Sequence, residues 1–270
     1  MNAKRGCANL LLGAALLAAP LAWARDGVEV GKNSAFSKLV PAESIEQTAR
    51  TQYQQTLQQA NQQQALAPAN HPQLQRLRRI ATRIIPFAVE WNPRAKDWQW
   101  EVNLIGSSQV NAWCMPGGKI AFYTGILDKL KLTDDEVAAV MGHEIAHALR
   151  EHARERMGKS VATNVGANLL SQLLGAGELG NTVIGGGAQL LSLQFSRSDE
   201  TEADLVGLEL AARAGFDPRA GITLWQKMGA QNKGAPPQWL NTHPSGKNRI
   251  AEMEKNLPKV LPLYEQAKKS

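Results

Sequence analysis

The chain carries a His-Glu-x-x-His sequence at residues 143–147. On a helix, the imidazoles of His143 and His147 lie one turn apart on the same face, where both can bind a single zinc ion. Glu144 lies beside them and can act as a general base. The chain has only five histidines in 270 residues, so this spacing is an improbable accident. It predicts a helix-borne metal site for hydrolysis.

A zinc ion in a hydrolytic site needs three protein ligands and one open position, so a third ligand must come from elsewhere in the chain. Glu200 and Asp204 are spaced i and i+4 in a stretch that is predicted to be helical as far as Gly215. We expect Glu200 to bind the metal and Asp204 to accept the outer N–H of a ligating histidine, fixing its tautomer. Glu202 on the same helix remains an alternative ligand.

The other three histidines and Cys114 lie in sequences that give weaker indications of a function. His71 carries no metal-binding spacing, and His152 follows His143 by nine residues, on the opposite face of a continuous helix. His243 lies in a Thr-His-Pro sequence that by itself indicates an exposed turn. Cys114 lies between a predicted strand and a turn, and we interpret it as a half-buried structural cysteine rather than a nucleophile.

The helix that carries the metal motif is predicted to run over residues 134–157. Thr133 can cap its start, and Glu136 three residues later completes a capping box. Gly158 is expected to end it. At 24 residues it would be a central element of the fold.

Two helices are predicted upstream, over residues 44–66 and from residue 74 to residue 85. Alternating apolar residues predict strands at 98–105, 110–115 and 119–124, the last two joined by a Pro-Gly-Gly turn. Helical patterns dominate the rest of the chain. The fold class is therefore expected to be mainly α, an α+β domain with one small antiparallel sheet.

Four motifs occur together in a fixed order along the chain. They are Asn111-Ala112 before the Pro-Gly-Gly turn, the His-Glu-x-x-His sequence, Glu200-x-x-x-Asp204, and His243-Pro244 followed by Arg249. With these motifs the chain resembles the zinc metallopeptidase family that contains the CAAX prenyl endopeptidase and the bacterial proteases HtpX, BepA and LoiP. The similarity covers about residues 45–256.

The resemblance implies a zincin-like helical domain of the gluzincin type, with one zinc ion per chain and Glu200 as its third protein ligand. It also implies that His243 and Arg249 line the active site, where either could stabilise the developing oxyanion. His243 could instead occupy the open zinc position at rest. The sequence departs from the pattern of some family members: we expect neither the transmembrane helices of HtpX nor the tetratricopeptide domain of BepA-like members. A compact peptidase is expected.

The N-terminal residues have the layout of a secretory signal peptide. Lys4 and Arg5 precede an apolar run at 10–21, and a small-x-small sequence ends at Ala24, after which we expect cleavage. Cys7 precedes the apolar run, so a lipoprotein is not predicted. We expect a flexible N-terminus at 25–43, a single metallopeptidase domain at 44–265, and export to a Gram-negative periplasm.

The charge and the glycine distribution limit the expected partners. The net charge of +6 is spread along the chain and gives no reason to expect nucleic acid. Residues 164–195 are rich in glycine and poor in charge. This segment is interpreted either as two short apolar helices with a hinge or as a flap that gates the site or makes peripheral membrane contact. The oligomeric state is left open.

The function predicted from these observations is zinc-dependent endopeptidase activity on unfolded or misfolded envelope proteins, a role in protein quality control. The strand around Asn111 is expected to pair with an extended substrate. Two alternatives stay open: a periplasmic chaperone or assembly factor for outer-membrane proteins that uses the same groove, and a structural zinc protein with a fourth protein ligand. Whether water or His243 takes the fourth position at rest stays open, and it decides whether the enzyme is always active.

Overall fold

The computed structural model describes most of the chain after residue 24. The described residues are 25–162, 190–191, 193–230, 238–244 and 248–269. The predicted signal peptide lies outside these ranges, and so does most of the glycine-rich segment 164–195. The two interpretations of that segment therefore stay predictions. Within the described ranges, no helix combines the length and the apolar character that crossing a membrane requires.

Three short strands form one sheet, and it is mixed. The strands are β1 (Glu101–Ile105), β2 (Ala112–Met115) and β3 (Lys119–Tyr123), in the order β1-β3-β2. The expected antiparallel hairpin joins β2 to β3, but β1 pairs parallel to β3, so the prediction of a purely antiparallel sheet was wrong in this detail. The reason is topological: the chain leaves β1, passes to the far side of β3, and only then forms the hairpin. β2 is consequently an edge strand.

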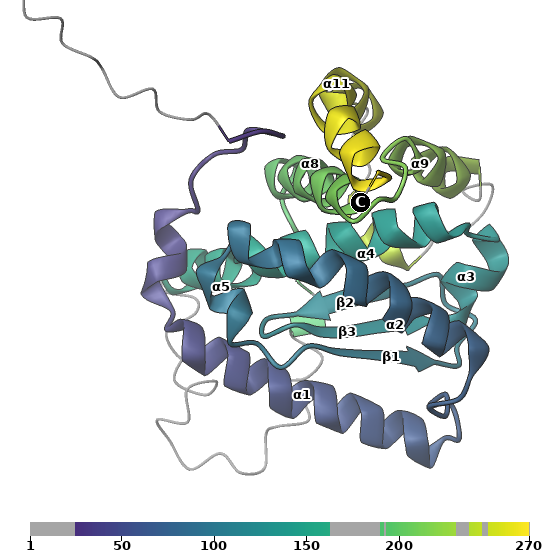
Figure 1. Ribbon diagram of the computed structural model, residues 1–270. Helices are drawn as coiled ribbons and strands as arrows, with labels where there is room; N and C mark the ends of the chain where they lie inside the picture. Colours follow the sequence, from purple (N-terminus) through teal and green to yellow (C-terminus); the bar gives the residue numbers. More distant parts are fainter. Residues whose placement is uncertain (1–24, 163–189, 192, 231–237, 245–247, 270) are drawn as a thin grey trace, which may run out of the picture.

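Helices cover both faces of this sheet, which confirms the mainly α fold class (Figure 1). α1 (Ala42–Gln62) lies along one face, and α4 (Asp134–Leu149) lies across the other. α2 (Pro72–Ile84) packs beside β1 and α4. The shorter elements are η1 (Ala35–Leu39), η2 (Ile85–Glu90), η3 (Pro93–Lys96), α3 (Thr124–Leu130) and α10 (Trp239–Thr242). Beyond α4 lie α8 (Arg197–Arg213), α9 (Ala220–Ala230) and α11 (Arg249–Ala267).

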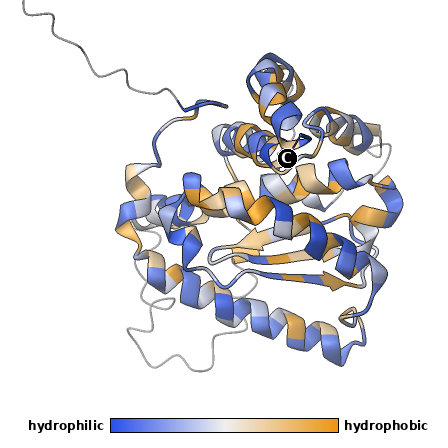
Figure 2. Cartoon of the chain, in the orientation of Figure 1, coloured by the Kyte–Doolittle hydropathy of each residue, from blue (hydrophilic) through white to orange (hydrophobic). Residues whose placement is uncertain are grey.

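The alternation of side chains along the strands divides the core between the two faces. Ile120 and Phe122 are fully buried toward α4 in the main core, whereas Trp113 and Ala121 pack on the α1 side with Tyr53. Figure 2 shows hydrophobic colouring on the strands and on parts of α4, and mostly hydrophilic colouring along α1. The sheet is therefore buried on both faces, and α4 is enclosed between it and α8.

The helix with the metal motif starts as predicted and ends earlier. Thr133 and Glu136 form the expected capping box in both directions. The helix stops at Leu149, however, and not near residue 157, because Glu151 adopts a left-handed conformation with φ of 59°. A new helix, α5 (His152–Ala162), starts directly afterwards. The predicted continuous 24-residue helix was wrong, and this break changes the position of every residue that follows it.

The segment 25–43, for which a flexible N-terminus was predicted, makes contacts with α8 and α5. The backbone N–H of Val28 donates to Glu209 of α8 at 2.8 Å, and Arg25 pairs with the same carboxylate. Further along, η1 packs on α5 at Gly158, where a Cβ atom would lie only 1.9 Å from the Phe36 carbonyl oxygen. Gly158 thus serves a close contact and not the predicted helix end.

α4 and α8 cross with their backbones in contact. A Cβ atom on Gly142 would lie 2.8 Å from the Gly207 carbonyl oxygen, and a Cβ on Gly207 would lie 2.7 Å from the His143 backbone nitrogen. Neither position tolerates a side chain without a shift of backbone against backbone. The two glycines therefore determine how closely the two helices approach one another.

We expect Gly207→Ala to reduce the free energy of unfolding by about 1–3 kcal/mol, since overpacking forces the helices apart. Gly229→Ala in α9 is the matched control, because no described atom lies within 4 Å of the added methyl group. This control should be neutral or gain up to ~1 kcal/mol from helix propensity. Denaturant unfolding of both variants measures the difference. Equal stability of the two variants would contradict the proposed constraint.

Candidate metal centre

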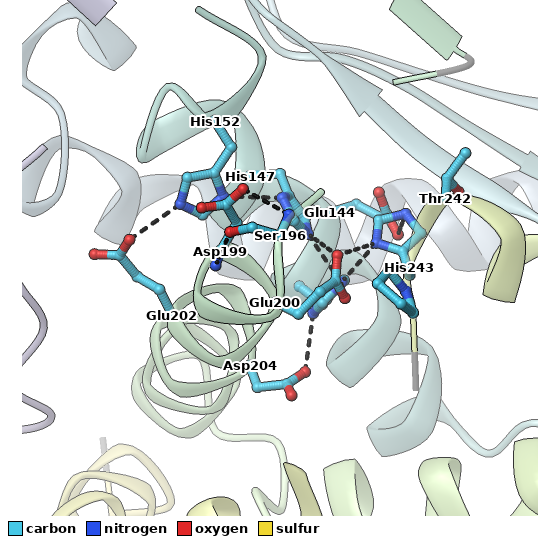
Figure 3. Close-up of polar contacts among 12 residues, drawn as sticks. Glu144, His147, His152, Ser196, Asp199, Glu200, Glu202, Asp204, Thr242 and His243 are labelled. Atoms are coloured by element: carbon cyan, nitrogen blue, oxygen red, sulfur yellow. Dashed lines mark hydrogen bonds and ion pairs between the residues drawn. The ribbon is translucent and has the colours of Figure 1, made fainter. Parts of the chain in front are cut away.

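Four buried side chains bring their donor atoms to one point between α4, α8 and α10 (Figure 3). The Nε2 atoms of His143 and His147 lie 3.1 Å apart. Glu200 Oε1 lies 3.4 Å from His147 Nε2, and His243 Nδ1 lies 3.0 Å from Glu200 Oε1 and 3.2 Å from His143 Nε2. The structure thus brings together the three predicted ligands and adds His243 to them.

These distances fit a single metal ion. Bonds of 2.0–2.1 Å in tetrahedral geometry place neighbouring donors about 3.3 Å apart, and the observed separations scatter around that value. Burial lowers the pKa of His147 well below its ordinary value, which keeps the imidazole in the neutral form that binds metal. Burial alone would raise the pKa of Glu200, but His243 and His147 hold it below its ordinary value, so this carboxyl group is ionised.

The helices position these donors through local sequence. His143 and His147 share one face of α4, as their spacing predicts. Glu200 lies in the first turn of α8, whose start is fixed by a capping box between Ser196 and Asp199. His243 follows the last residue of α10, and its backbone N–H donates to Trp239 at 2.9 Å. The donors therefore come from three elements that are far apart in the sequence.

Asp204 lies where the sequence predicted, behind a ligating histidine. Its Oδ1 is 3.0 Å from Nδ1 of His143. Burial would raise the pKa of Asp204, but the neighbouring Arg249 and His143 keep it lowered. An ionised carboxylate can only accept here, so His143 carries its proton on Nδ1 and presents a lone pair on Nε2 to the metal position.

The guanidinium of Arg249 contacts two buried carboxylates. Its Nε and Nη2 each lie 2.6 Å from the carboxylate of Asp204, and its Nη1 lies 2.6 Å from Oε2 of Glu200. All three guanidinium nitrogens are thus engaged by two buried carboxylates, one of them the predicted ligand Glu200. The role of Arg249 at the oxyanion stays a prediction.

Glu144 has a partner that the sequence did not reveal. The indole N–H of Trp239 donates to Glu144 Oε1 at 2.6 Å, and His243 Nε2 lies 3.5 Å from the same oxygen. Trp239 precedes His243 by four residues, and this i, i+4 spacing was the available signal. Trp239 in α10 thus contacts the candidate base, and His243 directly after α10 contacts the metal ligands.

A cleft opens beside this cluster along the edge strand β2. The residues at its wall include Asn111, Cys114, Glu144, His147, Phe195 and His243. Asn111, predicted to contact substrate, lines the cleft at the start of β2, and its carbonyl oxygen accepts from the N–H of Tyr123 in β3. Burial and the charge of Glu144 raise the pKa of the Cys114 thiol well above its ordinary value. Cys114 is therefore protonated, in keeping with a structural role.

His71, Glu202 and His152 lie outside the cluster. His71 caps α2 by accepting from the Gln73 N–H at 3.2 Å. Glu202, the alternative ligand, contacts His152 at 3.1 Å instead of joining the cluster. His152 was expected on the far face of the helix, but the break at Glu151 turns its ring back onto that of His147. That expectation was wrong, because it assumed an unbroken helix.

Two buried histidines on a helix, a glutamate from a second helix and a glutamate beside a cleft define a metallopeptidase-type centre. The comparison with family models agrees: residues 47–257 match the model of peptidase family M48. The chain belongs to this family of metallopeptidases.

Known relatives come from both eukaryotes and bacteria. The chain is 43% identical over 150 residues to a mitochondrial metalloendopeptidase OMA1 of Arabidopsis thaliana, covering 56% of this chain and 30% of that protein. It is 36% identical over 198 residues to the OMA1 of Schizosaccharomyces pombe, covering 72% and 56%. It is 30% identical over 206 residues to the metalloprotease LoiP of Escherichia coli, covering 74% and 77%. The chain thus spans less than two thirds of the OMA1 proteins.

The comparisons contradict the predicted periplasmic location. The plant and fission-yeast relatives carry names that place them in mitochondria. The N-terminal residues on which the prediction was based lie outside the described residues. A short basic and apolar N-terminal pattern was too weak a basis for assigning a compartment.

The placement of Arg249 makes a prediction about stability. We expect Arg249→Gln to lower the free energy of unfolding by about 3–5 kcal/mol in chelator, because it leaves buried carboxylates without a cation. Adding Asp204→Asn should recover part of this loss. Arg219→Gln is the matched control, since the Arg219–Asp217 pair lies at the surface and should contribute about 0–1 kcal/mol. Unchanged stability in the Arg249 variant would contradict this role.

Proposed function

We propose that this protein is a zinc-dependent endopeptidase that cleaves unfolded or misfolded protein segments. The observation that carries the proposal is the cluster of His143, His147, Glu200 and His243, which reaches a cleft beside an edge strand through His147 and His243. The donor set of imidazole nitrogens and one carboxylate at tetrahedral spacing favours zinc, with one ion per chain.

In this proposal, His143, His147 and Glu200 hold the zinc ion and Glu144 is the general base. A bound zinc ion supplies a Lewis acid that polarises the peptide carbonyl and makes water more acidic. Glu144 takes a proton from the attacking water and delivers it to the leaving amine. Its carboxylate is kept in place at the cleft wall by the indole N–H of Trp239.

His243 has a separate role in this proposal. Its Nδ1 lies within 3.0–3.2 Å of donors on Glu200 and His143, so it completes a four-donor set at rest. If all four donors held the metal, no position would be left for water, and the site would become competent only when His243 moves out. We therefore favour His243 over water in the resting fourth position, which makes displacement of His243 a condition of activity.

Substrate is proposed to bind as an added strand on β2. The Tyr123 N–H to Asn111 carbonyl bond sets the alternation of the β2–β3 ladder, so the backbone groups of Ala112 and Cys114 are directed away from β3. No described strand pairs with that side. A segment must be extended to pair there, and this requirement selects unfolded or misfolded chains for quality control.

The first test is Glu144→Gln. We expect a loss of peptidase activity of at least about 10²-fold on an unfolded protein, because the amide cannot accept a proton. Zinc content should stay the same, since Glu144 is not among the donors. Proteolysis and metal analysis of the same preparation measure both. The exposed Glu254→Gln in α11 is the control, and full activity of the Glu144 variant would rule out its role as base.

The second test addresses the substrate strand. Cys114→Pro removes an N–H that is directed outward, so the β2–β3 ladder should be retained, as edge strands tolerate such a proline. We expect kcat/KM for an extended peptide to fall at least about tenfold below that of Cys114→Ala, which changes the same side chain but keeps the N–H. Equal kcat/KM of the two variants would contradict strand pairing at this position.

A further inference from the structure

The outer nitrogen of His147 is in contact with a second histidine. Nδ1 of His147 lies 2.9 Å from Nδ1 of His152, and both side chains are buried. Nε2 of His152 lies 3.1 Å from Oε2 of Glu202 in α8. The break between α4 and α5 creates this arrangement, because it turns the first residue of α5 back toward the last turns of α4.

Only one arrangement of protons satisfies these contacts when His147 binds metal. A neutral imidazole that offers Nε2 to a metal carries its proton on Nδ1. The neighbouring Nδ1 of His152 must then accept this proton's hydrogen bond. A neutral His152 in turn carries its own proton on Nε2, where Glu202 accepts it. Each contact therefore selects the tautomer that the next one needs.

The outer end of this chain of contacts is fixed by an ion pair. Arg150, between α4 and α5, lies 2.5 Å from Oε1 of Glu202, and it also donates to the carbonyl of Gly31 in the N-terminal segment. This ion pair holds the Glu202 carboxylate beside Nε2 of His152, where it can accept the hydrogen bond.

The other helix-borne ligand is supported in the same way. His143 Nδ1 contacts Asp204, whose carboxylate is held by Arg249. His147 thus has the longer version of one scheme: imidazole N–H, an acceptor, and a carboxylate paired with arginine. Asp204 contacts His143 directly, because α8 crosses α4 at His143. His147 is connected to the Glu202 carboxylate through His152, which lies between them.

We propose that His152 and Glu202 are positioning residues that hold His147 in its metal-binding tautomer and orientation, with Arg150 anchoring them to the N-terminal segment. This proposal rests on the metal centre proposed above. Neither residue touches substrate or the metal, and their effect is exerted through His147 alone. Losing such an outer partner typically weakens metal binding by about 10–100-fold.

The test measures the zinc dissociation constant of the full chain by competition with a chelator. We expect His152→Ala to weaken zinc binding by about 10–100-fold, and Glu202→Ala to change it in the same direction. His152→Asn should recover most of the affinity, because its side-chain oxygen lies near the position of the lost Nδ1 and can accept from His147. His71→Ala is the control and should bind zinc as the wild type does.

A second measurement uses the wild-type protein, so it tests the proposal even if the alanine variant does not fold. In the zinc-loaded wild-type protein, nitrogen-detected NMR should show a protected proton on His147 Nδ1, hydrogen-bonded to His152 Nδ1. Absence of this proton, or unchanged zinc affinity in both alanine variants, overturns the proposal. A wild-type chain that binds no zinc would refute the proposed function instead, so the two failures are distinguishable.

Discussion

Helices α4 and α8 cross with their backbones in contact at Gly142 and Gly207, and this close approach sets the distances on which the metal cluster depends. His143 directly follows the contact point on α4. Glu200 and Asp204 lie on the turns of α8 that precede Gly207. A methyl group at either glycine would separate the helices by a fraction of an ångström to an ångström, and metal coordination tolerates only about 0.2 Å.

The second requirement is compensation of the charge of buried carboxylates. Glu200 and Asp204 are both buried and ionised, and the guanidinium of Arg249 lies between them at 2.6 Å. Buried carboxylates without such a partner are strongly unfavourable. α11, which carries Arg249, is therefore part of the support of the metal centre, although it packs against α8 and α9, away from the sheet (Figure 1).

The cleft along β2 gives access to the cluster, since its wall includes Glu144, His147 and His243. α10 carries Trp239, which contacts the base, and is followed directly by His243, which contacts the ligands. Because this short segment positions the base and the fourth donor together, its movement would change the chemistry of the whole site at once.

The sequence by itself determined the parts that depend on local geometry. The i, i+4 spacing on one helix fixed His143 and His147 with Glu144 beside them, the same spacing placed Glu200 ahead of Asp204, and the capping box fixed where α4 starts. The tertiary structure decided the rest: the parallel pairing of β1, the engagement of Arg249 by carboxylates, and the contact of His152 with His147 after a single left-handed residue. These features join residues distant in sequence or follow from a backbone break, and no local spacing encodes either.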